Sequence, residues 1–275
     1  MTKEKISSAI TQRLFTAIDE DDVVDEYVDL PAKIHLQYSQ KTLQKNYALC
    51  LQLWQEGCSR QALLSLVLKQ LREGHLSDRE KAQYKYMRAR YKHLRFAQRL
   101  YLRSHYSGFI FNKTTVALGH FQDGFRNNND KLTLTYGNKL RRFYLSSPVW
   151  AFVQYALGHG RLETSDGFAA YCRNQIAKLR AMVEKPLVTG SEFHDIRKII
   201  SQQVSFYDTL RSIEPDNLDA YKISRFLAAI NGLMGRKHDE MVLANLEKHQ
   251  PYETPAALDE QIRQRLEIFL ARYPS

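Results

Sequence analysis

The sequence predicts an all-helical protein, and three observations lead to this prediction. Only twelve glycines and seven prolines occur in 275 residues. The good helix formers Leu, Ala, Gln, Lys and Arg are abundant. No Asn-Gly or Asp-Gly pair stands between alternating apolar runs, which is the pattern typical of a β-hairpin. Because 44% of the residues are hydrophobic and 25% are charged, the chain can bury a sizeable core.

Caps and chain breakers place the expected helices along the chain. Ser77 followed by Glu80 forms a capping box, which predicts a helix that begins near Asp78. Ser191 and Pro215 mark further helix boundaries. The stretch 183–191, with Pro186 and Gly190, is the best candidate for an internal linker. The expected helices cover residues 8–18, 33–55, 59–73, 77–106, 109–124, 131–144, 147–158, 165–184, 191–212, 216–234, 237–248 and 255–272.

The cysteines and the apolar runs indicate a reducing compartment. Cys50, Cys58 and Cys172 are an odd and widely spaced set, which argues against a disulfide framework and against a zinc site. Residues 1–5 lack the apolar core of a signal peptide. The longest apolar stretch, near residues 62–68, is too short to span a bilayer. We therefore expect a cytoplasmic protein with no membrane partner.

The charge is unevenly spread and predicts an acidic partner. The formal net charge is +10, yet residues 1–30 hold three cations and eight anions, a net charge of −5, which leaves +15 for the other 245 residues. So basic a body favours nucleic acid, polyphosphate or an acidic membrane surface, although a basic protein can also be merely soluble. The acidic run from Asp19 to Asp29, closed by Pro31, is a solvated loop or a competitor that lies over the basic body.

One predicted helix carries a regular row of cations, which we name the cationic stripe. Spacings of three and four residues put all its members on one helix face, over about 27 Å. Like charges at this spacing repel one another, and a bound anion would compensate for that repulsion. Apolar residues flank the row on both sides, which predicts a groove between helices; the alternative is a surface row paired with acidic residues of another helix. The stripe consists of Lys85, Arg88, Lys92, Arg95, Arg99 and Arg103.

Two segments of the chain align with a constant offset of 109 residues and no gap. The matched positions share an aromatic residue, a following arginine and a later aspartate, so duplication is favoured over the chance similarity of two amphipathic helices. The matched pairs are Tyr84 and Phe193, Met87 and Ile196, Arg88 and Arg197, Leu118 and Leu227, Phe121 and Ile230, and Asp130 and Asp239.

These two copies resemble the conserved-histidine α-helical domain (CHAD) family, in which each copy carries a His-x-x-Arg helix, a basic cluster and a later turn that ends in Asp. The second copy matches at His194, Arg197 and Lys198, and again at residues 230–235 with His238 and Asp239. The first copy matches at Arg88, at residues 92–95, at residues 121–123 and at Asp130. Lys85 replaces the first histidine, and residues 201–204 replace the second basic cluster.

The resemblance covers residues 35–250 and implies two pseudo-repeated helical bundles around a basic groove that binds inorganic polyphosphate. We therefore expect an acidic segment at 1–32 and a helical domain at 33–275, with repeat one at about 33–160 and repeat two at about 161–275. The predicted anion contacts are the six stripe residues, His93, His194, Arg197 and Lys198. Because residues 201–204 are not basic, we expect the second copy to make fewer cationic contacts with the polyanion than the first.

Other activities are less well supported by the sequence. Walker, Gly-x-Gly-x-x-Gly, Gly-x-Ser-x-Gly and His-Glu-x-x-His motifs are absent, so we predict no enzyme, no cofactor and no metal site. His93, His194 and His238 could serve acid–base chemistry, but a lone helical histidine is more often structural. Two alternatives to polyphosphate stay open. One is nucleic acid bound by the same stripe with tyrosine stacking, and the other is a protein-interaction module with a decayed anion site.

Overall fold

The protein is helical throughout the computed structural model, which describes residues 5–20, 29–247 and 249–273. No strand occurs among these residues; two isolated bridges join Leu102 to Leu162 and Val188 to Ala256. The chain divides into two compact units, unit one with residues 1–46 and 164–275 and unit two with residues 47–163. The predicted all-α fold class is confirmed.

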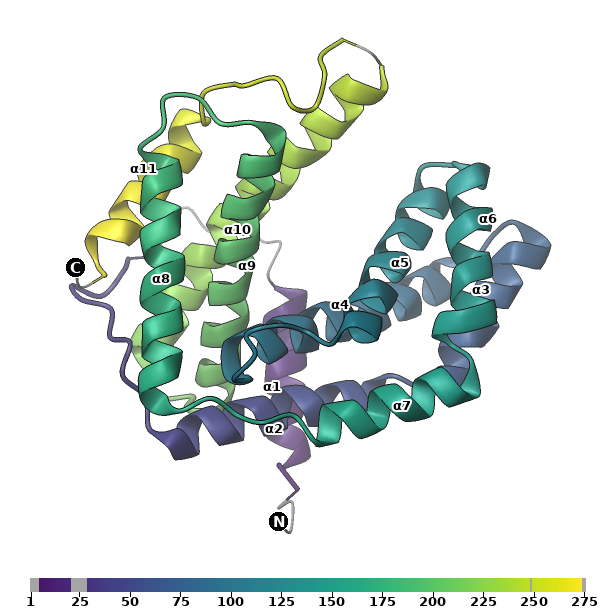
Figure 1. Cartoon of the computed structure of the whole chain (residues 1–275), viewed down its shortest axis with the longest axis horizontal. Helices are drawn as coiled ribbons and strands as arrows, with labels where there is room; N and C mark the ends of the chain where they lie inside the picture. The colour runs from purple at the N-terminus through teal and green to yellow at the C-terminus, as the bar shows by residue number, and fades with distance from the viewer. Residues whose placement is uncertain (1–4, 21–28, 248, 274–275) are drawn as a thin grey trace. The chain divides into compact units, whose positions relative to one another are not determined.

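Unit one is built around a long central helix, α9 (Gly190–Ile213). It packs against α1 (Ser8–Asp19), α8 (Ser165–Val183) and α10 (Leu218–Leu246), and α11 (Glu260–Ala271) contacts α8 and α10 (Figure 1). Residues 199–210 of α9 are all buried, so the core of this unit surrounds the second half of α9.

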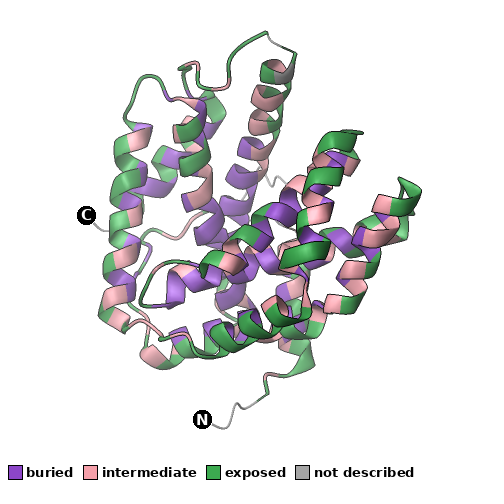
Figure 2. Ribbon diagram, turned by 45° about the vertical axis from the view of Figure 1, so that its right-hand side comes forward, coloured by how far each residue is buried: buried purple, intermediate pink, exposed green. Residues whose placement is uncertain are grey.

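Unit two is organised around α4 (Asp78–Tyr101), which packs against α3 (Arg60–Glu73) and α5 (Phe109–Arg126). Helix α2 (Gln40–Gly57) enters the unit at Tyr47. Helix α6 (Asp130–Lys139) lies against α5 and continues as a π-helical turn, η1 (Leu140–Tyr144), before α7 (Ser147–Gly158). Figure 2 shows buried and exposed residues alternating along most helices, as expected of amphipathic helices around a core.

Several predicted helix boundaries are wrong, and each has a local cause. The two helices predicted at 216–234 and 237–248 are replaced by the single helix α10, because Gly235 is tolerated inside it. Residues 33–39 and 255–259 lie outside the helices predicted to contain them. The predicted helix 77–106 ends at Tyr101, since Leu102 is extended and His105 has a φ of 47°.

Two other predictions concern the chain between and before the helices. The predicted linker 183–191 lies within unit one, where Val188 and Ala256 exchange backbone hydrogen bonds of 2.9 and 3.0 Å. Thr189, rather than Ser191, caps α9. Most of the acidic run, residues 21–28, lies outside the described residues; Asp19 ends α1, and Glu20 pairs with Arg211 at 3.3 Å.

Candidate anion-binding site

Helix α4 begins at the predicted capping box, which is confirmed. The Ser77 hydroxyl accepts the backbone N–H of Glu80 at 3.4 Å, and the Glu80 carboxylate accepts the backbone N–H of Ser77 at 2.8 Å. Lys69 of α3 also donates to this carboxylate at 2.8 Å. The bond from Lys69 and those from Ser77 lower the pKa of Glu80 to about 2. The first turn of α4 is therefore anchored both to its own cap and to α3.

The cationic stripe is the water-facing side of α4. From Tyr91 to Tyr101 every residue is buried except Lys92, Arg95 and Arg99, which are half-buried. Towards the start of the helix, Lys85 is exposed and Arg88 is half-buried. The apolar residues predicted to flank the row are buried, except for Tyr86 and Ala89, which are half-buried. Over its second half, α4 therefore meets solvent only through cations.

Arg103 does not belong to this helix face, so its predicted place on the helix is wrong. It lies two residues beyond the end of α4, after Leu102, which has φ −91° and ψ 143° and forms a bridge with Leu162. The backbone N–H of Arg103 donates to the carbonyl of Arg161 at 2.9 Å. The helical part of the stripe therefore runs from Lys85 to Arg99, about 21 Å at the usual helix rise.

The alternative of a surface row paired with acidic neighbours receives no support. Five of the six stripe cations have no carboxylate of the described residues within 4.0 Å. These five are Lys85, Arg88, Arg95, Arg99 and Arg103. Their charges are therefore not neutralised by a contacting acidic side chain of the described chain.

Arg95 is the most desolvated cation of the stripe. Its guanidinium lies over the Phe96 ring, 5.4 Å from the ring centroid, and its Nε is buried without a hydrogen-bond partner among the described residues. Desolvation, followed by the charges of Arg99 and Arg88, lowers the pKa of Arg95 to about 10. The side chain remains charged at neutral pH, so like charges are held together in a partly dry environment, where they interact strongly.

Arg88 lies across the neighbouring helix α5. Its Nη1 donates to the side-chain oxygen of Gln122 at 3.1 Å. A Cβ added to Gly119 would lie 3.3 Å from Nη2 of Arg88, so a glycine on α5 leaves room for the guanidinium. Contacts with α5 therefore hold the side chain of Arg88 in place. Arg95 and Arg99, in contrast, pair with no carboxylate of the described residues. Gly119 was not predicted as a contributor; a glycine inside a helix is the signal that could have pointed to it.

His93 lies on the buried side of α4. It is 4% exposed, so its imidazole is not accessible to an anion in solution. A position next to Lys92 in the sequence is turned by about 100° around the helix axis, which places His93 away from the cation row. We leave His93 out of the candidate site.

The other three predicted contacts, His194, Arg197 and Lys198, come together on α9 in unit one, not in unit two with the stripe. Helix α10 adds His238, whose ring centroid lies 5.6 Å from that of His194. Two carboxylates lie close to cationic members of this cluster and partly neutralise their charge. Lys198 pairs with Asp195 at 2.8 Å, and His238 lies 3.7 Å from Asp239. The cluster is therefore a weaker anion site than the stripe.

His194 gives unit one a pH-dependent stability. Partial desolvation of its ring, followed by the charges of Lys198, His238 and Arg197, lowers the pKa of His194 to about 4. The unfolded chain takes up a proton near the ordinary value of about 6.5 and so binds more protons between these two values. We expect stability to fall as the pH falls from 6.5 towards 4, and to fall less in His194→Gln. Urea midpoints at pH 7 and pH 5 measure this, with His249→Gln, which changes an exposed histidine, as control.

Residues 201–204, where the CHAD resemblance predicted a basic cluster, lie in the core of unit one. Residues 201–204 are buried on α9, where they form polar core contacts. Ser201 donates to Asn231 at 2.8 Å, and Gln203 accepts from the hydroxyl of Tyr273 at 3.0 Å. Cations at these positions would be buried without compensating charge, which is costly. This part of α9 therefore carries no water-facing row of cations.

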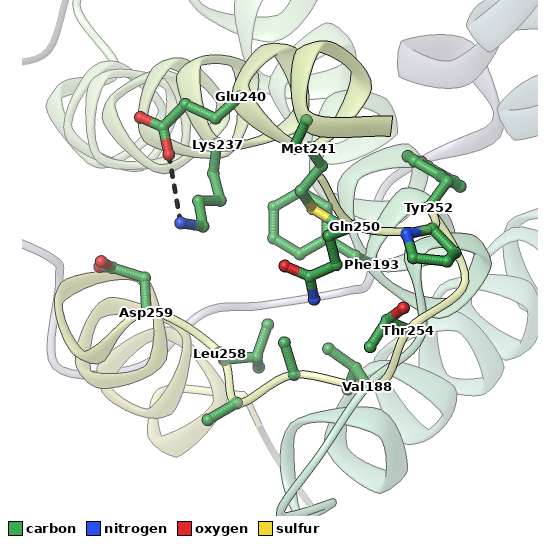
Figure 3. A pocket seen from close by; sticks show the side chains of 14 residues that line it. Val188, Phe193, Lys237, Glu240, Met241, Gln250, Tyr252, Thr254, Leu258 and Asp259 are labelled. Atoms are coloured by element: carbon green, nitrogen blue, oxygen red, sulfur yellow. Dashed lines mark hydrogen bonds and ion pairs between the residues drawn. The ribbon is translucent and has the colours of Figure 1, made fainter. Parts of the chain in front are cut away.

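Sequence reasoning missed a cavity of about 200 Å³ in unit one (Figure 3). It lies between α9, α10 and the segment 249–258, and Val188, Phe193, Met241 and Leu258 contribute apolar walls. Its charged groups are engaged: Lys237 pairs with Glu240 at 3.1 Å, and Asp259 caps α11. This cavity is therefore not a site for an anion.

Other chemistry has little structural basis in the described part of the chain. No group of three or more His, Cys, Asp or Glu side chains there could hold a metal ion. None of the three cysteines, all of which are described, takes part in a disulfide, and all three are buried. Across the described residues, none of the helices combines the length and the apolar character needed to cross a membrane.

Comparison with known proteins identifies no relative: no family model, no curated protein and no solved structure matches the chain significantly. The resemblance to the CHAD family stays a prediction.

Proposed function

We propose that this protein binds a linear polyanion, inorganic polyphosphate, along the water-facing side of α4, and that it acts by binding and not by catalysis. Arg95 and Arg99 are the principal contacts, with Lys85, Arg88 and Lys92 along the same face and Arg103 beyond the helix end. Arginine suits this role because its planar fork can contact two phosphate oxygens at once. A chain of phosphates laid along about 21 Å of helix can meet these cations in turn.

The observation that carries this proposal is the uncompensated charge around Arg95. Its Nε has no partner among the described residues, no described carboxylate pairs with it, and Arg88 and Arg99 lie close enough to lower its pKa. Holding like charges together in a desolvated place costs free energy, and a bound anion would remove that cost. Binding of a polyanion would therefore relieve an unfavourable interaction between cations that is already present in the free protein.

The exposure of the tyrosines favours polyphosphate over nucleic acid. Stacking on bases requires accessible aromatic faces. Of the four tyrosines that flank the stripe, Tyr84, Tyr91 and Tyr101 are at most 1% exposed and serve the core of unit two, and only Tyr86 is partly exposed. A polyanion without bases needs only the cations.

We also retain duplication and the CHAD resemblance as parts of the proposal. The matched pairs of the 109-residue alignment are buried in both copies at the four apolar positions. In each copy the matched arginine lies over a glycine of the following helix, but these two glycines are 116 residues apart and are not a matched pair of the alignment. A Cβ on Gly119 would be 3.3 Å from Arg88, and one on Gly235 would be 3.1 Å from Arg197. The burial of the four apolar pairs supports a duplicated helical hairpin. A cytoplasmic location, also part of the proposal, rests on the sparse, widely spaced cysteines and on the shortness of the apolar runs.

The test compares long-chain polyphosphate with single-stranded RNA at two salt concentrations. For six phosphate contacts, one for each stripe cation, we expect the affinity of the wild type to fall on the order of three-hundredfold between 50 and 200 mM salt. We expect Arg95→Gln/Arg99→Gln to lose about 10- to 100-fold in affinity at low salt and to reduce the salt slope by about two contacts. Isothermal titration calorimetry measures both quantities.

The control removes the same charge elsewhere in unit two. Arg141 and Arg142 are exposed and precede α7. If the affinity for polyphosphate depends only on the net charge of the protein, Arg141→Gln/Arg142→Gln will lose as much affinity as the stripe variant. That result would show that the proposed site is wrong. Tighter binding of RNA than of polyphosphate would favour the nucleic-acid alternative. No binding of either polyanion would favour a protein-interaction module.

A further inference from the structure

Helix α7 is unusual in this basic protein because it contains no charged side chain over residues 147–158. One face belongs to the core of unit two. Val153 and Leu157 are buried, Trp150 stacks on Trp54 with ring centroids 5.3 Å apart, and the hydroxyl of Tyr47 donates to the Leu157 carbonyl at 3.1 Å. This face explains why the helix packs against α2.

The opposite face of α7 is also apolar, and it is exposed. Its members recur at intervals of three and four residues and lie on one side of the helix: Pro148, Ala151, Phe152, Tyr155 and Ala156. Phe152 is 56% exposed and Tyr155 is 64% exposed. A surface helix normally places polar residues on its outer side, and a helix that is apolar all round is expected in a core or in contact with lipid. Exposed apolar patches of this kind mark interaction sites.

The chain around α7 supplies positive charge without any acidic residue. Residues 131–162 contain no Asp or Glu. The cations of this segment are all exposed: Lys131, Lys139, Arg141, Arg142 and Arg161. Phe143, which follows Arg142 in η1, is 52% exposed. Exposed aromatic rings beside exposed cations are the combination that interfacial helices use at anionic lipid surfaces.

We propose that α7 and η1 bind peripherally to the surface of an anionic lipid bilayer. Phe152, Tyr155 and Phe143 enter the headgroup region, and Arg141 and Arg142 contact lipid phosphates. At twelve residues, α7 is about 18 Å long, well short of a hydrocarbon core of about 30 Å, so it lies in the plane of the surface. The predicted lack of a membrane partner rested on spanning length, which surface binding does not need.

The charge pattern favours lipid over the other occupants of an apolar face. A second copy of the chain would bring the same five cations against each other, with no acidic residue of 131–162 to offset them. A single-stranded nucleic acid could use the cations and stack bases on the exposed rings, but it would leave the aliphatic part of the face, Pro148, Ala151 and Ala156, without a partner. An anionic bilayer satisfies both the charge and the apolar face.

The experiment is co-sedimentation with vesicles of phosphatidylcholine alone and of phosphatidylcholine with phosphatidylglycerol, at low and at physiological salt. We expect the wild type to bind the anionic vesicles, less so as salt rises, and to bind neutral vesicles weakly. Phe152→Ser/Tyr155→Ser and Arg141→Gln/Arg142→Gln should each lose at least tenfold in partitioning. A Phe152→Trp variant should shift its fluorescence to the blue on binding.

Matched controls separate this surface from general stickiness and charge. Leu218→Ser/Leu243→Ser removes exposed apolar side chains from α10, and Arg72→Gln/Arg79→Gln removes two exposed cations of unit two outside both proposed sites; both should bind vesicles like the wild type. Equal binding by every variant, or no binding to anionic vesicles, overturns the proposal. So does light scattering that shows a wild-type dimer dissociated by Phe152→Ser/Tyr155→Ser, because the face would then join two copies. Unchanged circular dichroism confirms that the variants fold.

Discussion

Replacing Trp54 with alanine is expected to destabilise unit two by about 3–5 kcal/mol, which is the usual cost of removing a large buried aromatic side chain. Trp54 is completely buried. Its ring meets Tyr91 edge-on at 5.5 Å, Phe111 at 5.9 Å and Trp150 in a stack at 5.3 Å, so it joins α2, α4, α5 and α7. Alanine would leave a cavity lined by three aromatic rings that cannot all move inward together.

Tryptophan fluorescence makes this measurement specific to unit two. The chain has two tryptophans, Trp54 and Trp150, and both lie in that unit. In the variant, Trp150 alone reports the urea transition. Phe152→Ala, on the exposed side of α7, is the control and should change stability by less than about 0.5 kcal/mol. A loss below about 1 kcal/mol for Trp54→Ala would show that the aromatic cluster is not tightly packed.

Replacing Asp208 with alanine is expected to destabilise unit one by about 3 kcal/mol, because the change leaves a partly buried cation without its nearest partner. Asp208 is fully buried on α9. Its Oδ1 accepts from the Ser224 hydroxyl at 2.6 Å and from Nε of Arg211 at 3.2 Å. Arg211 keeps a second contact with Glu20 of 3.3 Å, which limits the loss.

Two companion substitutions separate charge from hydrogen bonding at Asp208. Asp208→Asn keeps an oxygen that can accept both hydrogen bonds, so it should cost less than alanine. Asp195→Ala breaks only a surface ion pair with Lys198 and should cost less than about 1 kcal/mol. Urea unfolding followed by far-ultraviolet circular dichroism measures all three. Equal losses for Asp208→Ala and Asp195→Ala would mean that the buried pair has no special role.

The stripe shows what the spacing of residues alone can predict about a candidate site. The spacing from Lys85 to Arg99 correctly implied a single helix face, because 3.6 residues per turn is a local property of the backbone. The same spacing included Arg103, which is wrong, because Leu102 leaves the helix to pair with Leu162, sixty positions later in the chain. A run of helix formers does not report such a distant contact.

Burial around α4 and α9 was even less accessible to sequence reasoning. His93 carries a functional group suited to an anion site, but it faces the core. Ser201 to Val204 suggested decay of a basic cluster, whereas the structure shows a polar core enclosed by neighbouring helices. The sequence shows that residues 147–158 carry no charge. Only the packing of α7 on α2 shows which side of this helix remains exposed.

By itself, the sequence determined the helical fold class, the capping box that starts α4, the row of cations on one helix face and the acid-free stretch 131–162. These are properties of residue type and of neighbours a few positions apart. The tertiary structure alone decided which side of each helix meets water, which cations are unpaired and desolvated, and where α4 ends. These features depend on contacts between residues far apart in the chain, since burial and electrostatic compensation arise only when helices pack against one another.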